Sequence, residues 1–207
     1  MIYLLRHGET IWNRAGRAQG RGDSPLTWRG VGHAEAYGRW LARELEANGG
    51  DFELHSSPLF RTWQTASIVA DHLAFEVDRL RTSPLLAELD CGQWEGLTAE
   101  EMERHDADRF AERRRDPWSG SPPGGESRSQ VHQRALRWLE SEPRGSVSVV
   151  VAHGIVSRVL RGAYLGLEPS EILELDSHHH GVLFRLFDGK VERIDTNGGA
   201  SSRPGQS

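Results

Sequence analysis

A His-Gly pair follows each of two apolar runs that lie far apart in the chain. One pair begins at His7, directly after residues 2–5, and the other begins at His153, after the β-branched run 147–152. An apolar run that stops at a glycine is typical of a buried strand leading into a loop. Open α/β sheets bind ligands just outside the carboxyl ends of their strands, and a neutral imidazole can attack an electrophile there. The pattern therefore predicts two imidazoles that face one pocket.

Two arginines accompany these histidines. Arg6 directly precedes His7, and Arg61 follows a Ser-Ser-Pro sequence at 56–58. Serine followed by proline is a signal for the start of a helix, which places Arg61 in the first turn. No carboxylate stands one helical turn away from Arg61. We therefore expect this guanidinium to have an anionic partner other than a residue of its own helix.

Segment 85–98 supplies the candidates for a general acid. It contains Glu88, Asp90 and Glu95, and its two glycines and apolar residues indicate an ordered loop rather than a linker. A carboxyl group can protonate a leaving oxygen and later accept a proton from water. The residue types alone do not distinguish the three candidates.

The elements that must position these residues alternate along the chain. Apolar and β-branched runs predict strands at 2–6, 52–55, 77–80, 147–152, 182–187 and 191–194. Helical patterns at 27–47, 59–73, 98–115, 127–141 and 154–165 separate most of them. Alternation of this kind predicts an α/β fold with a largely parallel sheet covered on both faces.

Composition excludes several classes of function. The chain has 207 residues, long enough to bury a core as one domain, and a net charge of −5 that does not favour nucleic acid. Cys91 is the only cysteine, which excludes an internal disulfide and fits a reducing compartment. We find no membrane-length apolar run and no signal peptide. These features predict a cytoplasmic protein without a membrane or nucleic-acid partner.

Three consecutive histidines, at 178–180, raise the question of a metal site. Side chains of neighbouring residues in an extended segment point to alternate faces, so at most His178 and His180 could share a ligand. No further Cys or His partner is evident in the sequence. We therefore expect no metal site.

The motifs of the chain resemble those of the histidine phosphatase superfamily, which includes the cofactor-dependent phosphoglycerate mutases. The matching pieces occur in the family's order over residues 1–165. They are Leu5-Arg6-His7-Gly8-Glu9-Thr10, Gln19-Gly20-Arg21-Gly22-Asp23-Ser24-Pro25-Leu26-Thr27, Ser56-Ser57-Pro58-Leu59 with Arg61-Thr62, Glu88 with Gly92-Gln93-Trp94-Glu95-Gly96, Gly125-Glu126-Ser127, and Ala152-His153-Gly154. The resemblance implies a three-layer α/β/α sandwich with a mostly parallel central sheet, similar to phosphoglycerate mutase.

The resemblance also implies a role for each site residue. His7 would be the nucleophile that takes a phosphoryl group, Arg6, Arg61 and His153 would bind that group, and Glu88 would protonate the leaving alkoxide. A guanidinium suits this task because its planar fork meets two phosphate oxygens at once. Neighbouring arginines would keep His7 neutral, and a backbone acceptor near Gly8 would fix its tautomer. The expected substrate-binding residues are Asn13, Gly8, Gln19, Gly20, Arg21 and Gly154.

The domain organisation follows from the same resemblance. Residues 1–195 would form a single domain, with 98–126 as a lid over the active site and 196–207 as a disordered tail. Arg113, Arg114 and Arg115 would extend the basic field if the lid folds over the pocket, and a solvated helix end is the alternative.

The resemblance leaves two activities open. A phosphatase passes the phosphoryl group to water, whereas a mutase returns it to another hydroxyl of the same sugar acid. The short segment after Glu88, and Ile155 where mutases have asparagine, favour a phosphatase acting on a small phosphorylated metabolite without a cofactor. Residues 112–116 and the Pro122-Pro123 pair resemble a mutase, which would need 2,3-bisphosphoglycerate as its primer.

A phosphoprotein phosphatase and a non-catalytic binding module are further alternatives. A non-catalytic binding module would be expected to lack at least one of the residues that the resemblance assigns to catalysis. All five of these residues are present: Arg6, His7, Arg61, Glu88 and His153. We therefore expect an enzyme, and a homodimer is compatible with these features.

Overall fold

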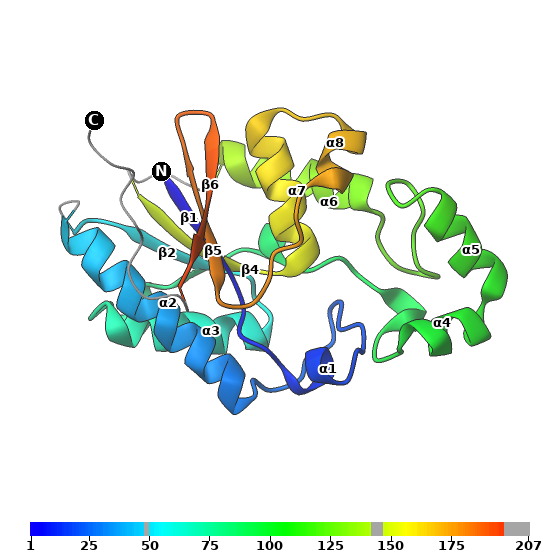
Figure 1. Cartoon of the computed structure of the whole chain (residues 1–207), viewed down its shortest axis with the longest axis horizontal. Helices are drawn as coiled ribbons and strands as arrows, with labels where there is room; N and C mark the ends of the chain where they lie inside the picture. Colours follow the sequence, from blue (N-terminus) through cyan, green and yellow to red (C-terminus); the bar gives the residue numbers. More distant parts are fainter. Residues whose placement is uncertain (48–49, 142–146, 197–207) are drawn as a thin grey trace.

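The structure, a computed structural model, describes residues 1–47, 50–141 and 147–196. Its centre is a six-stranded sheet in the order β3-β2-β4-β1-β5-β6 (Figure 1). The first four strands of that order run parallel, β5 pairs antiparallel with β1, and β6 pairs antiparallel with β5. The strands are β1 (Ile2–Arg6), β2 (Glu53–Ser56), β3 (Arg81–Thr82), β4 (Ser148–Ala152), β5 (Val182–Phe187) and β6 (Lys190–Asp195). The helices are α1 (Ile11–Arg14), α2 (Trp28–Ala47), α3 (Phe60–His72), α4 (Ala99–His105), α5 (Ala107–Arg115), α6 (Arg128–Ser141), α7 (Gly154–Leu165) and α8 (Pro169–Glu174).

The side chains of the central strands point alternately to the two faces of the sheet, so the hydrophobic core has two layers. Tyr3 and Leu5 of β1 pack against α2 and α3, whereas Ile2 and Leu4 of the same strand pack against α6 and α7. Successive side chains of a strand point to opposite faces, so a strand that is apolar at every position must be covered on both sides. Figure 1 shows α2 and α3 on one side of the sheet and α6, α7 and α8 on the other. The predicted three-layer α/β/α sandwich is confirmed.

One predicted strand is wrong. Residues 77–80 begin a 3-10 helix, η1 (Val77–Arg79), and the edge strand β3 follows at Arg81–Thr82. Both residues of β3 are exposed, so this edge strand has no apolar pattern to reveal it. Backbone pairing with His55 and Ser56 of β2 defines it instead.

The predicted helix 98–115 is two helices, α4 and α5. Asp106 separates them with an extended backbone, φ −155°, and its side chain accepts a hydrogen bond from the amide of Arg109. An aspartate that caps the next helix interrupts the previous one, because its own φ and ψ are non-helical. The sequence pattern does not predict the short helices α1 and α8.

The parallel strands bring three segments to one edge. β4 lies between β1 and β2, so the residues after Arg6, Ala152 and Ser56 emerge side by side. The amide of His7 donates to the Ala152 carbonyl at 3.0 Å, and the amide of Ser57 donates to the Val151 carbonyl at 3.1 Å. The chain therefore delivers His7, His153 and Ser57 to a common point, as the rule for carboxyl strand ends requires.

Helices α4 and α5 form an arm at one side of the molecule (Figure 1). The guanidinium of Arg17 pairs with the Glu101 carboxylate of α4 at 2.7 Å, and the Trp94 ring packs edge-to-face on Phe110 of α5. This places the arm beside the loop that carries Arg17 and next to the Glu88 segment. Of the predicted tail, residues 197–207 lie outside the described residues. Within the part that the structure describes, no helix combines the length and apolar character needed to span a bilayer.

Candidate active site

His7 is a buried, neutral imidazole with a fixed tautomer. Its Nδ1 lies 2.7 Å from the carbonyl oxygen of Gly8, which can only accept a hydrogen bond. Nδ1 therefore carries the hydrogen and Nε2 keeps its lone pair. Burial lowers the pKa of His7 well below its usual range, and the charges of Arg6 and Arg61 lower it further. These causes leave Nε2 able to act as a nucleophile near neutral pH.

Other imidazoles surround His7. The His153 ring lies 5.2 Å from it and the His180 ring lies 5.6 Å from it, centroid to centroid. Nδ1 of His180 donates to the His7 carbonyl at 2.9 Å, and burial lowers the pKa of His180 to about 3. His178 is also buried and donates from Nε2 to the Val182 carbonyl at 2.8 Å. The histidines at 178 and 180 thus have protein partners, and the described residues contain no group of three side chains suited to a metal ion.

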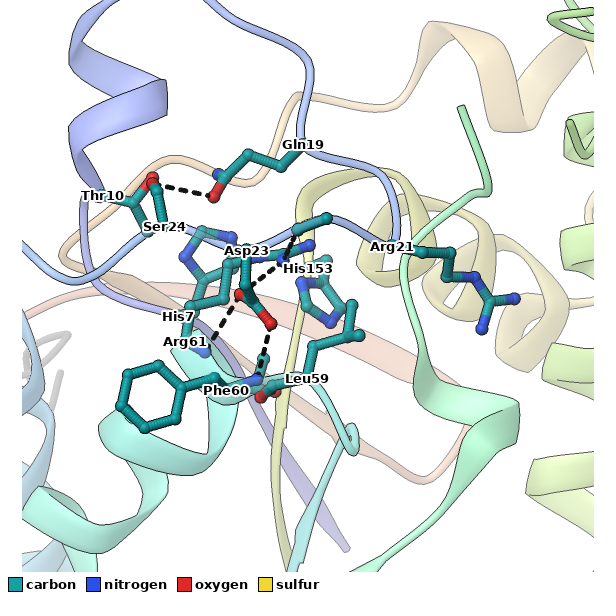
Figure 2. A network of polar contacts seen from close by, with 12 residues as sticks. His7, Thr10, Gln19, Arg21, Asp23, Ser24, Leu59, Phe60, Arg61 and His153 are labelled. Carbon is teal, nitrogen blue, oxygen red and sulfur yellow. Dashed lines mark hydrogen bonds and ion pairs between the residues drawn. The ribbon is translucent and has the colours of Figure 1, made fainter. Parts of the chain in front are cut away.

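Arg61 is held by the loop that precedes α2 rather than by its own helix. Its Nη1 donates to the Asp23 carboxylate at 2.8 Å and its Nη2 donates to the Gly20 carbonyl at 2.8 Å (Figure 2). Asp23 also accepts hydrogen bonds from the amides of Phe60 and Arg61, so it caps α3. Within the described residues Arg61 therefore pairs with Asp23, a residue whose role the sequence did not reveal. One carboxylate fixes both the start of the helix and the direction of its first arginine.

Three buried nitrogen atoms around His7 have no hydrogen-bond partner among the described residues. They are Nε of Arg6, Nε of Arg61 and Nδ1 of His153. Neighbouring nitrogens of the same groups do have partners: Arg6 Nη1 donates to the His178 carbonyl at 2.7 Å, and His153 Nε2 lies 2.8 Å from Ser57 Oγ. Buried donors without partners are costly, so they indicate a site built for an acceptor-rich anion.

His153 is neutral in this arrangement. Burial lowers its pKa well below the usual range, and the charges of Arg61 and Arg134 act in the same direction. A bound dianion would oppose all of these effects, because it stabilises an imidazolium.

Glu88 is the candidate acid that reaches the cavity. One of its oxygens accepts from the amides of Leu89 and Val156, at 2.9 and 3.3 Å, and the other accepts from Ile155 at 3.2 Å. The carboxylate thus lies at the N-terminus of α7, directly after His153 and Gly154. The helix terminus orients the carboxylate by donating backbone N–H groups to it.

The other two acid candidates are used in the loop itself. Asp90 accepts from the amide of Gly92 at 2.8 Å, and Glu95 accepts from the amide of Arg21 at 2.5 Å. Cys91 does line the cavity, but burial raises the pKa of its thiol to about 12, so it stays protonated. Of the three acid candidates, Glu88 is therefore the one that lines the cavity together with His7.

A cavity of about 380 Å³ is lined by Arg6, His7, Arg61 and Glu88 and suits a small metabolite. Its described lining does not include His153, so of the two imidazoles predicted to face one pocket only His7 lines the cavity, and His153 lies behind it against the His7 ring. Among the expected substrate-binding residues, its lining includes Asn13, Gln19, Gly20 and Gly154. The described lining does not include Gly8 or Arg21.

Gly8 and Arg21 have other contacts. A Cβ on Gly8 would lie 2.2 Å from the Gly30 carbonyl oxygen, so this glycine permits close backbone packing rather than ligand approach. The Arg21 side chain points away from His7 and His153 and lies 3.7 Å from the Glu126 carboxylate (Figure 2).

The buried histidines make stability depend on pH. Burial lowers the folded-state pKa of His7, His153 and His178 well below 6.5, so the unfolded chain binds more protons below that pH. We therefore expect the free energy of unfolding to be greatest above pH 6.5 and to decrease as the pH falls from 6.5 to 5. The slope is up to about 1.4 kcal/mol per pH unit for each histidine. Urea unfolding at four pH values across this window measures it.

This pH range lies above the titration of ordinary carboxylates, so their contribution is small. The exposed His105 provides a control, because His105→Asn should leave the slope unchanged. A free energy of unfolding that stays constant from pH 7 to 5 would show that these imidazoles protonate in the folded state without penalty.

Known proteins are similar to this chain in sequence and in fold. The family model of the histidine phosphatase superfamily (branch 1) matches residues 2–196. A protein of Yersinia enterocolitica named probable phosphoglycerate mutase GpmB is 34% identical over 197 residues, which is 94% of this chain and 84% of that protein.

Solved structures agree on the fold. The mycobacterial glucosyl-3-phosphoglycerate phosphatase is similar with a TM-score of 0.71 and 27% identity, over 89% of this chain and 92% of the other. YhfR of Bacillus stearothermophilus is similar with a TM-score of 0.74 and 28% identity, over 92% and 93% of the two chains. The chain belongs to the histidine phosphatase superfamily, branch 1.

Proposed function

We propose that this protein is a metal-independent phosphomonoesterase that acts on a small phosphorylated metabolite through a phosphohistidine at His7. One observation supports it above the others: beside a neutral imidazole that keeps the lone pair of Nε2 lie buried nitrogens of Arg6, Arg61 and His153 that have no hydrogen-bond partner in the described part of the chain. Phosphoryl transfer depends mainly on positioning and on charge stabilisation, and these groups supply both.

The first step forms the phosphohistidine. Nε2 of His7 attacks phosphorus, an N–P bond forms, and the bond from phosphorus to the ester oxygen breaks. Arg6 and Arg61 bind the equatorial oxygens, and His153 donates from Nδ1 as negative charge develops. Glu88, in its protonated form, gives its proton to the leaving oxygen, so that a neutral alcohol departs.

The second step returns the site to its starting state. The carboxylate of Glu88 takes a proton from a water molecule, whose oxygen attacks phosphorus. The N–P bond breaks, inorganic phosphate leaves, and His7 regains its lone pair. Glu88 is protonated again, so one carboxyl group serves as acid and then as base.

A phosphoglycerate mutase primed by 2,3-bisphosphoglycerate is the second candidate. The name of the Yersinia relative favours it. Both reactions use the same phosphohistidine, and they differ in whether water or a second hydroxyl accepts the phosphoryl group. Ile155 and the short segment after Glu88 favour water as the acceptor.

A panel assay with both readouts distinguishes the two. Phosphate release from a set of phosphomonoesters is measured in the presence of a chelator, beside isomerisation of 3-phosphoglycerate primed with 2,3-bisphosphoglycerate. We expect phosphate release that the chelator does not reduce, and no 2-phosphoglycerate. Efficient isomerisation with little phosphate release would make the protein a mutase, and loss of activity in chelator would contradict the metal-independent step.

A further inference from the structure

A second group of guanidiniums lies by the cavity, separate from Arg6 and Arg61. Arg128 from the start of α6 and Arg158 from α7 line the cavity together with Glu88. Arg113, near the end of α5, is close enough to Arg128 to influence its ionisation. Arg128 and Arg158 thus bring positive charge to the cavity beside Glu88, the proposed acid for the leaving alcohol, and Arg113 adds to this charge from outside the described lining.

These arginines have only neutral partners among the described residues. Nη1 of Arg128 donates to the Pro117 carbonyl at 2.5 Å. Arg158 donates to the Leu173 carbonyl at 3.5 Å and to Ser177 Oγ.

Arg113 also lacks an acidic partner in the described part of the chain. Its guanidinium lies over the Trp94 ring, 5.9 Å from the centroid, and its buried Nε has no hydrogen-bond partner there. By contrast, three other arginines near the site are paired with carboxylates: Arg17 with Glu101, Arg61 with Asp23, and Arg134 with Glu126.

Arg113 and Arg158 each repel the charge of Arg128. Burial, followed by the charges of Arg113 and Arg158, lowers the pKa of Arg128 to about 10. Glu88 and Cys91 are the groups that oppose this shift, and the Cys91 thiol stays protonated. Adjacent, partly buried cations that have Glu88 as their nearby anion in the described part of the chain are unfavourable, and an anionic ligand would stabilise them.

We infer that the substrate carries a second anionic group, a carboxylate or a further phosphate, which Arg128 and Arg158 bind while its phosphoryl group lies at His7. This inference rests on the proposed function, because it assumes that the phosphoryl end is at Arg6 and Arg61. Arg128 and Arg158 would then set specificity, and phosphomonoesters with an uncharged alcohol would bind weakly.

Non-hydrolysable phosphonates test this by calorimetry on the intact protein. The probes are 2-hydroxyethylphosphonate, phosphonoacetate and methylenebisphosphonate, which differ in the group attached to the phosphonate. We expect the wild-type protein to bind one or both of the doubly anionic probes about 10- to 100-fold more tightly than 2-hydroxyethylphosphonate. A preference between them identifies the second group as carboxylate or phosphate.

Matched variants assign the effect to residues. Arg128→Gln and Arg158→Gln should each remove most of the preference and keep the affinity for 2-hydroxyethylphosphonate. Arg114→Gln is the control, since Arg114 is exposed on α5 and the cavity lining does not include it. Thermal unfolding of each variant verifies that it is folded.

Each outcome has one meaning. Equal binding of all three probes by the wild-type protein would overturn the inference and leave the proposed function intact. A preference that survives both substitutions would also overturn it, because other residues would then carry the preference. Failure of every phosphonate to bind would contradict the phosphoryl site itself, and the proposed function with it.

Discussion

Replacing His7 by alanine is expected to reduce phosphate release from every phosphomonoester by at least about 10³-fold. The nucleophile is lost, and the neighbouring described groups do not replace it: Nε2 of His153 faces Ser57, the Cys91 thiol stays protonated, and the described cavity lining does not include His180. Steady-state kinetics with p-nitrophenyl phosphate and one alkyl phosphate measure the loss.

The variant should remain folded and should still bind phosphate. The backbone bond from the His7 amide to Ala152 does not depend on the side chain, and Arg6, Arg61 and His153 remain. His105→Ala, at an exposed position on α4, is the matched control and should keep full activity. A His7→Ala protein that turns over substrate at the wild-type rate would disprove the nucleophile assignment.

Replacing Glu88 by glutamine should separate substrates by their leaving groups. An alkyl ester needs a proton on its departing oxygen, whereas p-nitrophenolate leaves without one. We therefore expect kcat/KM to fall by about 10²- to 10⁴-fold for an alkyl phosphate and much less for p-nitrophenyl phosphate. The measurement is the ratio of the two losses in one preparation.

A structural effect of the same substitution would look different. The Glu88 oxygens accept from the amides of Leu89, Ile155 and Val156, and the glutamine amide nitrogen cannot accept such a bond. Any resulting disturbance would slow both substrates alike. Equal losses on the two substrates would therefore remove the acid role and leave Glu88 as an orienting residue for α7.

The buried strands of the fold were predictable from the sequence, whereas the exposed edge strand and the break between α4 and α5 were not. β1 and β4 are apolar at nearly every position because both faces of the sheet are covered, and such runs are visible in one sequence. β3 has two exposed residues and depends on pairing with β2, so its residues 81–82 carry no signal of their own. The break between α4 and α5 depends on one capping aspartate, Asp106, inside a pattern that otherwise favours a helix.

Part of the candidate site could likewise be predicted from the sequence, and part could not. His7 and His153 each follow a buried strand, and the rule that ligands bind at carboxyl strand ends is enough to predict that they lie together. The partner of Arg61 could not be found like this, because Asp23 is 38 positions away and reaches it through a loop. Arg128 and Arg158 gave no sequence signal, since each is an ordinary arginine on a helix and only the cavity joins them.

Gly8 illustrates a different limit of prediction from sequence. The sequence indicates it as a residue that lets a ligand approach the backbone. The position that a Cβ would occupy instead faces the carbonyl oxygen of Gly30, at 2.2 Å. A pattern can require glycine without telling which neighbour requires it.

Trapping the phosphorylated enzyme tests the central claim most directly. The wild-type protein is mixed with p-nitrophenyl phosphate, quenched rapidly in denaturant at alkaline pH, and digested for mass spectrometry. The account predicts one added phosphoryl group on the peptide that contains His7, stable in base and lost in acid, and none in His7→Ala. A phosphoryl group on any other residue, or turnover with no phosphorylated enzyme at any quench time, would contradict it.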